Sequence, residues 1–369
     1  MKRILKVILF TGADMMKKLH ISFIFVFLVL ALCAPATADE AAGYKVITVS
    51  VRGEYEIPCG VWYPATGGNA KAAYDFGKSV VEGKAILNAA PNGELGPLPI
   101  IVYSHGYSGC SHSSVFLAES LARSGFIVIA PDHTDDLKAC SLREDFVRER
   151  GYTVKLLKKA IRLSRALSSG EYDTGHFKYR YMEVSAAVDW IIDTGGDPAS
   201  PFYRLVDSER IGIVGHSLGA YSALAVSGVI DIAHDPRITA VVAMSGPGDR
   251  VFTCDKMAEV KIPAMLMYGG NERGRKEGGL ELQFRCLSEP KFLLVISGAD
   301  HLTFAESVLR YRNKRDEEKR HDVIVKYVDA FFEYFINGEE AAKEVLKKRG
   351  PGLDDYDFIF RHKCQKKFR

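Results

Sequence analysis

The fold is decided by the stretch RIGIVGHSLGAYSALAV, which covers residues 210–226. Its first part, Arg210 to Val214, is a short apolar run that predicts a buried strand, and Ala220 to Val226 predicts a helix. Between them lies a G-x-S-x-G pentapeptide with Ser217 at its centre. A sharp turn from strand to helix lifts a serine hydroxyl above a sheet, and glycines let the two elements approach closely. The stretch therefore predicts a nucleophilic serine.

The segments around this stretch alternate between predicted strands and helices. Two antiparallel strands are expected within 44–63, further strands at 99–104, 126–130, 238–244, 264–268 and 292–296, and helices at 115–124, 181–192 and 323–335. Residues 65–98 are rich in Gly, Ala, Asn and Pro and are expected to be mostly loop. The alternation predicts an α/β fold with a mostly parallel central sheet and helices on both faces.

The first 38 residues have the features of a secretory signal peptide with a superfluous start. Lys17 and Lys18 precede an apolar run over residues 21–34, and Ala36-Thr37-Ala38 is a small-residue cleavage site. The apolar run is short for a membrane span. We therefore expect cleavage after Ala38, a periplasmic or secreted protein without a stable membrane span, and one domain over residues 39–369.

Cleavage of the leader would change the charge balance of the chain, and export would place its cysteines in an oxidising compartment. Removing the five basic residues and one acidic residue of the leader leaves 44 basic against 45 acidic residues, which gives no reason to expect a nucleic-acid partner.

Six cysteines remain after the leader is removed, an even number that suits disulfides; free buried thiols are the alternative. The preferred pair is Cys254 with Cys286, since both lie near the loops expected to carry catalytic groups. No C-x-x-C or H-x-x-x-H pair is present, so we expect no metal site.

Residues 134–174 form a charged insertion that is expected to be helical. Its apolar residues share one stripe, and its basic residues cover the other face. The favoured expectation is a helix packed on the body with a solvated face, and the alternative is a lid or a membrane-surface helix. The stripe consists of Val154, Leu156, Leu157, Ala160, Ile161, Leu163 and Leu167.

A serine hydroxyl needs a base to take its proton, and the base needs an acid to fix its tautomer. His301 follows the strand predicted at 292–296, and in this architecture the histidine comes last along the chain. Glu272 is the preferred acid because it follows the strand at 264–268 and two glycines. Asp249, after the strand at 238–244, is its rival.

The developing oxyanion needs two backbone N–H donors. One is expected from Leu218, the residue after the nucleophile, and the other from the loop after an early strand. The loop Ser104-His105-Gly106-Tyr107-Ser108-Gly109 has the required glycines, so Tyr107 is the second expected donor. His105 is expected to brace the loop, and the Tyr107 and Tyr221 rings to wall an acyl pocket.

Together these segments resemble the α/β-hydrolase superfamily, in particular bacterial predicted dienelactone hydrolases and platelet-activating-factor acetylhydrolase-like serine esterases. The likeness runs over about residues 44–345 and is carried by local segments: Val61–Ala65, Ser104–Gly109, Leu121–Phe126, Ala130–His133 and Arg210–Ser217. The resemblance implies the α/β-hydrolase fold and carboxylic-ester hydrolysis without a metal or organic cofactor. By that resemblance Ser217 is the nucleophile, His301 the base, and Tyr107 and Leu218 the oxyanion donors.

Two departures from the family pattern stand out. The family usually has Asp as the acid, where this chain offers Glu272, and dienelactone hydrolases in the strict sense use a cysteine nucleophile. The expected activity is cleavage of carboxylic esters through an acyl-enzyme on Ser217, with a small-molecule ester or a lipid-like substrate. Alternatives are a thioesterase, an amidase, or a lipid or polyester hydrolase with the same residues. A non-catalytic binding module on this fold is a further alternative, although such proteins typically lose the nucleophile or the base.

Overall fold

The computed structural model describes residues 41–77, 79–169, 174–246, 251–272, 279–306 and 314–360. The predicted signal peptide lies outside these residues. The strands are β1 (Ala41–Val51), β2 (Tyr55–Ala65), β3 (Lys71–Asp75), β4 (Val80–Leu87), β5 (Leu98–Ser104), β6 (Ile127–Pro131), β7 (Val206–His216), β8 (Ile238–Met244), β9 (Ala264–Gly269), β10 (Lys291–Ile296) and β11 (Leu353–Ile359).

All of these strands form one sheet in the order β11-β10-β9-β8-β7-β5-β6-β2-β1-β4-β3. The block from β6 to β10 is parallel throughout. β2 joins it antiparallel at one side and β11 at the other. After β5 the chain adds β6 on one side and then returns to add β7 on the other side of β5. Sites in such sheets lie at the carboxyl ends of the strands, where the order reverses.

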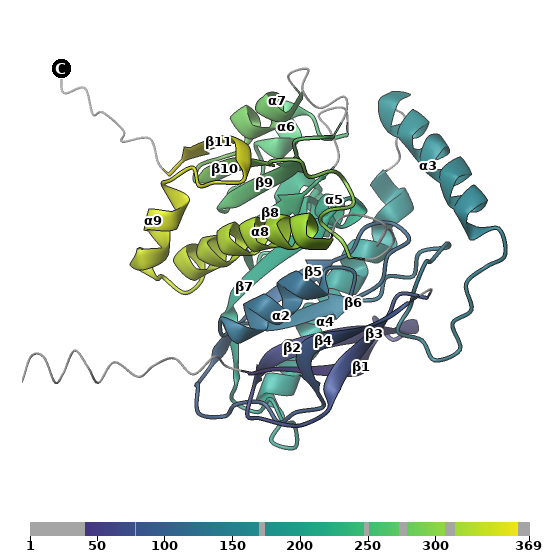
Figure 1. Cartoon of the computed structure of the whole chain (residues 1–369), viewed down its shortest axis with the longest axis vertical. Coiled ribbons are helices and arrows are strands. Elements are labelled where there is room, and N and C mark those ends of the chain that lie inside the picture. Colours follow the sequence, from purple (N-terminus) through teal and green to yellow (C-terminus); the bar gives the residue numbers. More distant parts are fainter. Residues whose placement is uncertain are drawn as a thin grey trace, which may run out of the picture. The chain divides into compact units, whose positions relative to one another are not determined.

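Helices cover both faces of this sheet (Figure 1). α2 (Val115–Arg123) and α8 (Lys314–Phe335) pack on one face, and α4 (Lys178–Gly196) and α5 (Leu218–Leu224) pack on the other. A further long helix is α3 (Tyr152–Ser169). The remaining helical segments are short: α6 (Cys254–Met257), α7 (Gly279–Cys286), α9 (Lys343–Leu346), η1 (Thr174–Phe177), η2 (Ala225–Val229), η3 (Asp231–Ala233) and η4 (Glu340–Ala342).

The central strands are apolar along their whole length because both of their faces are covered. In β5, Ile100 and Val102 face the cluster that includes α4, while Ile101 and Tyr103 face the cluster that includes α8. All seven residues of β5 are buried. The predicted α/β architecture with helices on both faces of a mostly parallel sheet is confirmed.

The expectation that residues 65–98 are mostly loop missed two strands, β3 and β4, which lie there. In β3 the side chains of Ala72 and Tyr74 are buried and their neighbours are exposed. This alternation is that of a half-buried strand, but it is short and lies within a stretch rich in Gly and Ala. β11 was also not predicted as a strand. It places Tyr356 and Phe358, together with Phe360, against the core under α8.

The insertion at 134–174 differs from the favoured expectation. It forms an irregular segment followed by α3, which stands out from the sheet and its covering helices (Figure 1). Val154 and Leu157 are 58% and 62% exposed, so this part of the stripe is not packed on the body. Leu156 and Tyr107 both pack against a small buried cluster that includes Tyr152. The side chains of Ala160, Ile161, Leu163 and Leu167 lie outside the described residues.

Two disulfides are present in the part of the chain that the structure describes. Cys254 pairs with Cys286, as predicted, and Cys110 pairs with Cys140. Cys59 is a buried free thiol, and Cys364 lies outside the described residues. The Cys110–Cys140 disulfide joins the loop after β5 to the segment after β6. It therefore links the expected oxyanion loop to the start of the insertion.

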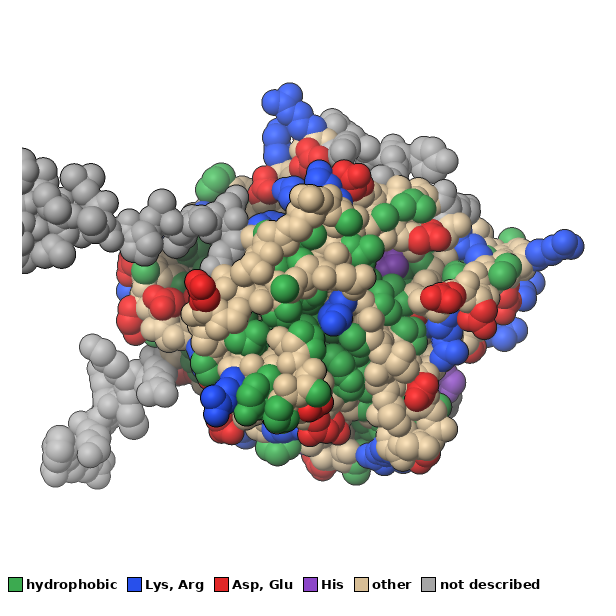
Figure 2. Space-filling view, turned by 90° about the horizontal axis from the view of Figure 1, so that it is seen from below, with side chains coloured by type: hydrophobic (Ala, Val, Ile, Leu, Met, Phe, Trp, Pro, Cys, Tyr) green, Lys and Arg blue, Asp and Glu red, His purple; other side chains and the backbone are tan. Residues whose placement is uncertain are grey.

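The surface carries both signs of charge. On the face shown in Figure 2, acidic and basic side chains alternate around the margin, and hydrophobic side chains are more frequent toward the middle. Within the described ranges, no helix combines the length and the apolar composition that crossing a bilayer would need.

Removing the Cys254–Cys286 disulfide is expected to destabilise the protein. The crosslink spans a sequence separation of 32 residues, and the entropy of an open loop of that length gives a loss of about 3–4 kcal/mol for Cys254→Ser/Cys286→Ser. Denaturant unfolding would measure it. Cys59→Ala, which breaks no disulfide, is the control and should cost about 1 kcal/mol. A double variant as stable as the wild type would contradict the pairing.

Candidate active site

Ser217 occupies a strained turn between β7 and α5. Its φ of 56° and ψ of −117° lie outside the regions that non-glycine residues ordinarily adopt. A side chain at Gly219 would overlap the Ser104 carbonyl, and one at Gly215 would overlap the Gly219 carbonyl. Both glycines of the pentapeptide are therefore required by close backbone packing, and the turn leaves Ser217 partly exposed at the carboxyl edge of the sheet.

His301 lies beside Ser217, in the loop after β10. Its Nε2 is 2.9 Å from Ser217 Oγ, which is hydrogen-bonding distance. The imidazole is partly open, with 44% of the side chain exposed. His216 holds this loop, since its Nε2 lies 2.8 Å from the His301 carbonyl oxygen and donates to it. The histidine next to the serine therefore supports the loop and does not face the Ser217 hydroxyl.

The other side of the His301 ring contacts a serine. Ser245 Oγ is 2.6 Å from His301 Nδ1 and donates its hydrogen to Glu272 Oε2 at 2.8 Å. A hydroxyl has one hydrogen, so Ser245 must accept from a protonated Nδ1. His301 Nε2 is then unprotonated and able to accept the Ser217 hydrogen. The arrangement fixes the tautomer that proton removal from Ser217 requires.

Glu272 lies behind this serine. Its Oε2 is 3.7 Å from His301 Nδ1, beyond direct hydrogen-bonding distance, and only 6% of its side chain is exposed. Its Oε1 accepts from the Gly269 N–H at 2.8 Å. Glu272 therefore presents a fixed, buried carboxylate to His301 through Ser245. The rival acid, Asp249, lies outside the described residues.

Ser245 is the site residue that sequence reasoning missed. It follows β8 directly, is 1% exposed and has a positive φ of 49°. Such backbone strain on a non-glycine residue clusters at functional sites. No local sequence pattern marks Ser245, because its place beside His301 depends on the pairing of β8 with β7, the strand that precedes Ser217.

The two expected oxyanion donors flank Ser217. Leu218 is the first residue of α5, and N–H groups in the first turn of a helix have no partner within the helix. Tyr107 follows Gly106, where an added Cβ would lie 3.2 Å from the Ser217 Cβ. The loop after β5 therefore passes directly beside the nucleophile candidate, as close as a residue without a side chain allows.

His105 is a buried part of this loop. Its Nδ1 donates to the Gly106 carbonyl at 2.7 Å, and its Nε2 accepts from the His133 N–H at 3.1 Å. Burial holds the pKa of His105 well below its usual value, and the neighbouring His133 and Arg180 lower it further. The ring is neutral and braces the loop, which agrees with the expectation.

The two expected pocket-wall tyrosines differ. Tyr107 is partly buried and donates from its hydroxyl to Asp136 at 2.7 Å. Tyr221 is 1% exposed and stacks on Phe252 at 5.0 Å between ring centroids. The expectation that its ring walls an acyl pocket is wrong, because α5 directs it into the core between the helices and the sheet.

One group of metal-ligating residue types comes together among the described residues. Cys110, His112 and Cys140 have ligand atoms within 4.8 Å of one another. Because the two sulfurs are bonded to each other, neither is a thiolate that could bind a metal.

Comparison with known proteins relates the chain to one family of hydrolases. Residues 71–243 match the family described as platelet-activating factor acetylhydrolase, isoform II. Curated relatives include the platelet-activating factor acetylhydrolases of Bos taurus, 23% identical over 229 residues and 56% of this chain, and of Cavia porcellus, 23% identical over 263 residues and 64% of this chain.

The matched regions span 48% of the Bos taurus protein and 57% of the Cavia porcellus protein. The match covers β3 to β8 and includes Tyr107, Ser217 and Leu218. His301, Glu272 and Ser245 lie beyond the end of this match. The chain has the α/β-hydrolase fold, and in sequence it is similar to the platelet-activating factor acetylhydrolases.

Proposed function

We propose that the protein is a serine ester hydrolase that forms an acyl-enzyme on Ser217. The observation that carries the proposal is the chain of hydrogen bonds from Ser217 through His301 and Ser245 to Glu272. It links a hydroxyl to an unprotonated imidazole nitrogen and ends at a buried carboxylate. A base and an acid partner activate a serine in acyl transfer, and here Ser245 connects the two.

In the proposed mechanism His301 Nε2 takes the Ser217 hydrogen as Ser217 Oγ attacks the ester carbonyl. The Leu218 and Tyr107 N–H groups bind the oxyanion. The bond to the alcohol breaks, and the alcohol leaves with the proton from His301. Water then attacks the acyl-enzyme and gives a proton to His301, which passes it to Ser217 Oγ as the acid is released. Glu272 stabilises the imidazolium through Ser245 in both steps.

The proposed substrates are short acyl esters, including the acetyl ester of a phospholipid. Support comes from the names of the relatives, which are acetylhydrolases of a platelet-activating factor. We further propose export as one domain after cleavage at Ala38. The leader pattern supports this, as do the two disulfides, which persist in oxidising compartments.

Ser217→Ala is expected to lower kcat by about 10⁵- to 10⁶-fold, because no other group replaces the nucleophile. Hydrolysis of p-nitrophenyl acetate by the mature protein measures the loss. A fluorophosphonate probe should label Ser217 in the wild type and nothing in the variant. Ser288→Ala is the matched control and should keep full activity. An active Ser217→Ala protein would refute the mechanism, and a folded wild type without label or turnover would favour a binding role.

Glu272→Gln is expected to lower kcat by about 10²- to 10³-fold, because the imidazolium loses its counter-charge. Ser245→Ala should lose activity by the same route. The two losses should therefore not add, and the double variant should resemble Glu272→Gln alone. Steady-state kinetics of the single and double variants measure this cycle, with the exposed Glu281→Gln as control. Full activity in Glu272→Gln would move the acid to Asp249.

Acyl-chain preference tests the substrate class. The wild type is expected to have a higher kcat/KM for p-nitrophenyl acetate than for the octanoate, and to release acetate from a 2-acetyl phospholipid faster than palmitate from a 2-palmitoyl one. Differential fit of the acyl chain in the transition state would cause the preference. Faster cleavage of the long-chain esters would exclude an acetylhydrolase and favour a lipase-like role.

A further inference from the structure

An ion pair is buried beneath the loop that carries Tyr107. Arg180 of α4 and Asp135 of the segment after β6 have fully buried side chains. They bond through two parallel contacts, Nε to Oδ1 at 3.0 Å and Nη2 to Oδ2 at 2.6 Å. The Arg180 charge keeps the pKa of Asp135 below its usual value although burial acts to raise it. Burying two charges is costly and is weak evidence for a stabilising role, so the pair calls for another explanation.

Both partners also bind the backbone of the loop. Arg180 Nη1 donates to the His105 carbonyl at 2.7 Å, and Asp135 Oδ2 accepts from the Ser108 N–H at 2.9 Å. These two contacts lie on either side of the Gly106–Tyr107 peptide. Tyr179, next to Arg180 on α4, donates to Asp135 Oδ1 at 2.6 Å. The carboxylate is thus held from α4 as well as from the loop.

The peptide between these contacts has a fixed direction. The Gly106 carbonyl accepts from His105 Nδ1 at 2.7 Å and from the Gly109 N–H at 3.0 Å, and it lies 3.5 Å from Arg180 Nη2. The Gly106–Tyr107 bond is not among the cis peptides, so the Tyr107 N–H points opposite to that carbonyl. The N–H therefore points away from the Arg180 guanidinium.

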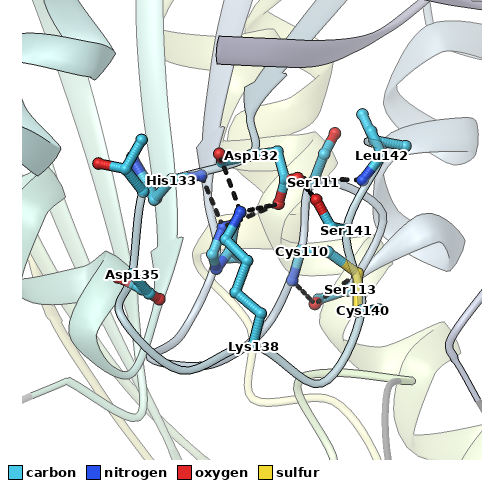
Figure 3. Close-up of polar contacts among 12 residues, drawn as sticks. Cys110, Ser111, Ser113, Asp132, His133, Asp135, Lys138, Cys140, Ser141 and Leu142 are labelled. Carbon is cyan, nitrogen blue, oxygen red and sulfur yellow. Dashed lines mark hydrogen bonds and ion pairs between the residues drawn. A yellow bond between two sulfur atoms is a disulfide. The ribbon is translucent and has the colours of Figure 1, made fainter. Parts of the chain in front are cut away.

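The segment that supplies Asp135 is itself fixed at its two ends. Figure 3 shows Asp135 on a loop closed by the Asp132 carboxylate and by the Cys110–Cys140 disulfide. Asp132 Oδ2 accepts from Ser141 Oγ at 2.5 Å and from the Leu142 N–H at 3.0 Å, and Lys138 Nζ lies 2.9 Å from its Oδ1. A carboxylate on so constrained a loop can position what it binds without moving during the reaction.

We propose that Arg180 and Asp135 are positioning residues of the oxyanion hole: they hold the Gly106–Tyr107 peptide so that its N–H faces the oxyanion formed at Ser217. Neither touches the substrate. The inference rests on the proposed ester hydrolysis by Ser217. It assigns to a buried ion pair the preorganisation that makes an oxyanion hole effective.

The test uses Arg180→Met/Asp135→Leu, which removes both charges and leaves neither unpaired. We expect a folded protein whose kcat falls about 10²-fold, the scale of one lost oxyanion donor, with KM nearly unchanged. Arg180→Lys keeps a cation without the two-pronged contact and should lose less. Arg237→Met/Asp235→Leu removes an ion pair that precedes β8, at the edge of the sheet opposite the loop, and should keep the wild-type kcat.

A second readout separates positioning from general damage. Ser217 Oγ adds to the carbonyl carbon of a trifluoromethyl ketone, its proton passes to His301, and the ketone oxygen becomes an oxyanion. The inhibition constant should therefore rise about 10²-fold in Arg180→Met/Asp135→Leu and to a smaller, parallel extent in Arg180→Lys. Labelling of Ser217 by the fluorophosphonate and loss of turnover in Ser217→Ala establish the underlying reaction independently.

Each result decides the proposal. Wild-type kcat or unchanged ketone inhibition in Arg180→Lys and in a folded double variant would overturn it while leaving the hydrolase in place. If the double variant fails to fold, Arg180→Lys decides alone, by whether kcat and ketone affinity fall together. A wild type that neither labels nor turns over would overturn both the proposed function and this inference.

Discussion

The candidate site depends on the register of the parallel strands. Ser104 pairs with Gly215, His216 with Met244, Met244 with Met267, and Ile296 with Gly269. The ladder continues one step further, since the Ser217 N–H donates to Met244 O at 2.9 Å and the Ser245 N–H to Met267 O at 2.7 Å. Because the strands end together, Ser217, Ser245 and the loops with Glu272 and His301 begin at one edge. A shift of one residue in any pairing would turn that strand's side chains to the other face.

Two kinds of interaction maintain the site above this edge. Backbone crowding brings the serine turn against the loop after β5: it leaves no space for side chains at Gly215 and Gly219 and little space at Gly106. Hydrogen bonds to His301 then set the direction of proton transfer. Below the loop lies a polar interior of buried charges and neutral histidines, where burial lowers the pKa of His133 and raises that of Glu183 to about 7. Elsewhere the core is mostly hydrocarbon, with separate buried polar groups such as Glu119, Gln283 and Lys291.

The sequence was most informative where a local pattern has a local cause. The turn at Ser217 and the apolar runs of β5 to β10 could be predicted, because short-range sterics and two-sided burial produce them. His301 and Glu272 followed from chain order, and the structure brings both toward Ser217. Ser245 could not be found this way, since its role depends on the pairing of β8 with its neighbours. Arg180 left a usable signal: it lies four residues before Val184 on the buried face of α4, where a charge needs a partner. Its partner, Asp135, is distant in sequence, so the pattern alone does not identify it.

The C-terminal strand has a consequence for how copies of this protein meet. Without β11, the unpaired backbone groups of β10 would form an open sheet edge, a template for pairing with another chain. β11 covers that edge, and three of its seven residues, Asp354, Asp355 and Asp357, are exposed carboxylates. Two such strands brought together would place six negative charges along one seam. At the β11 edge the sheet therefore carries like charges that oppose pairing with a copy of itself.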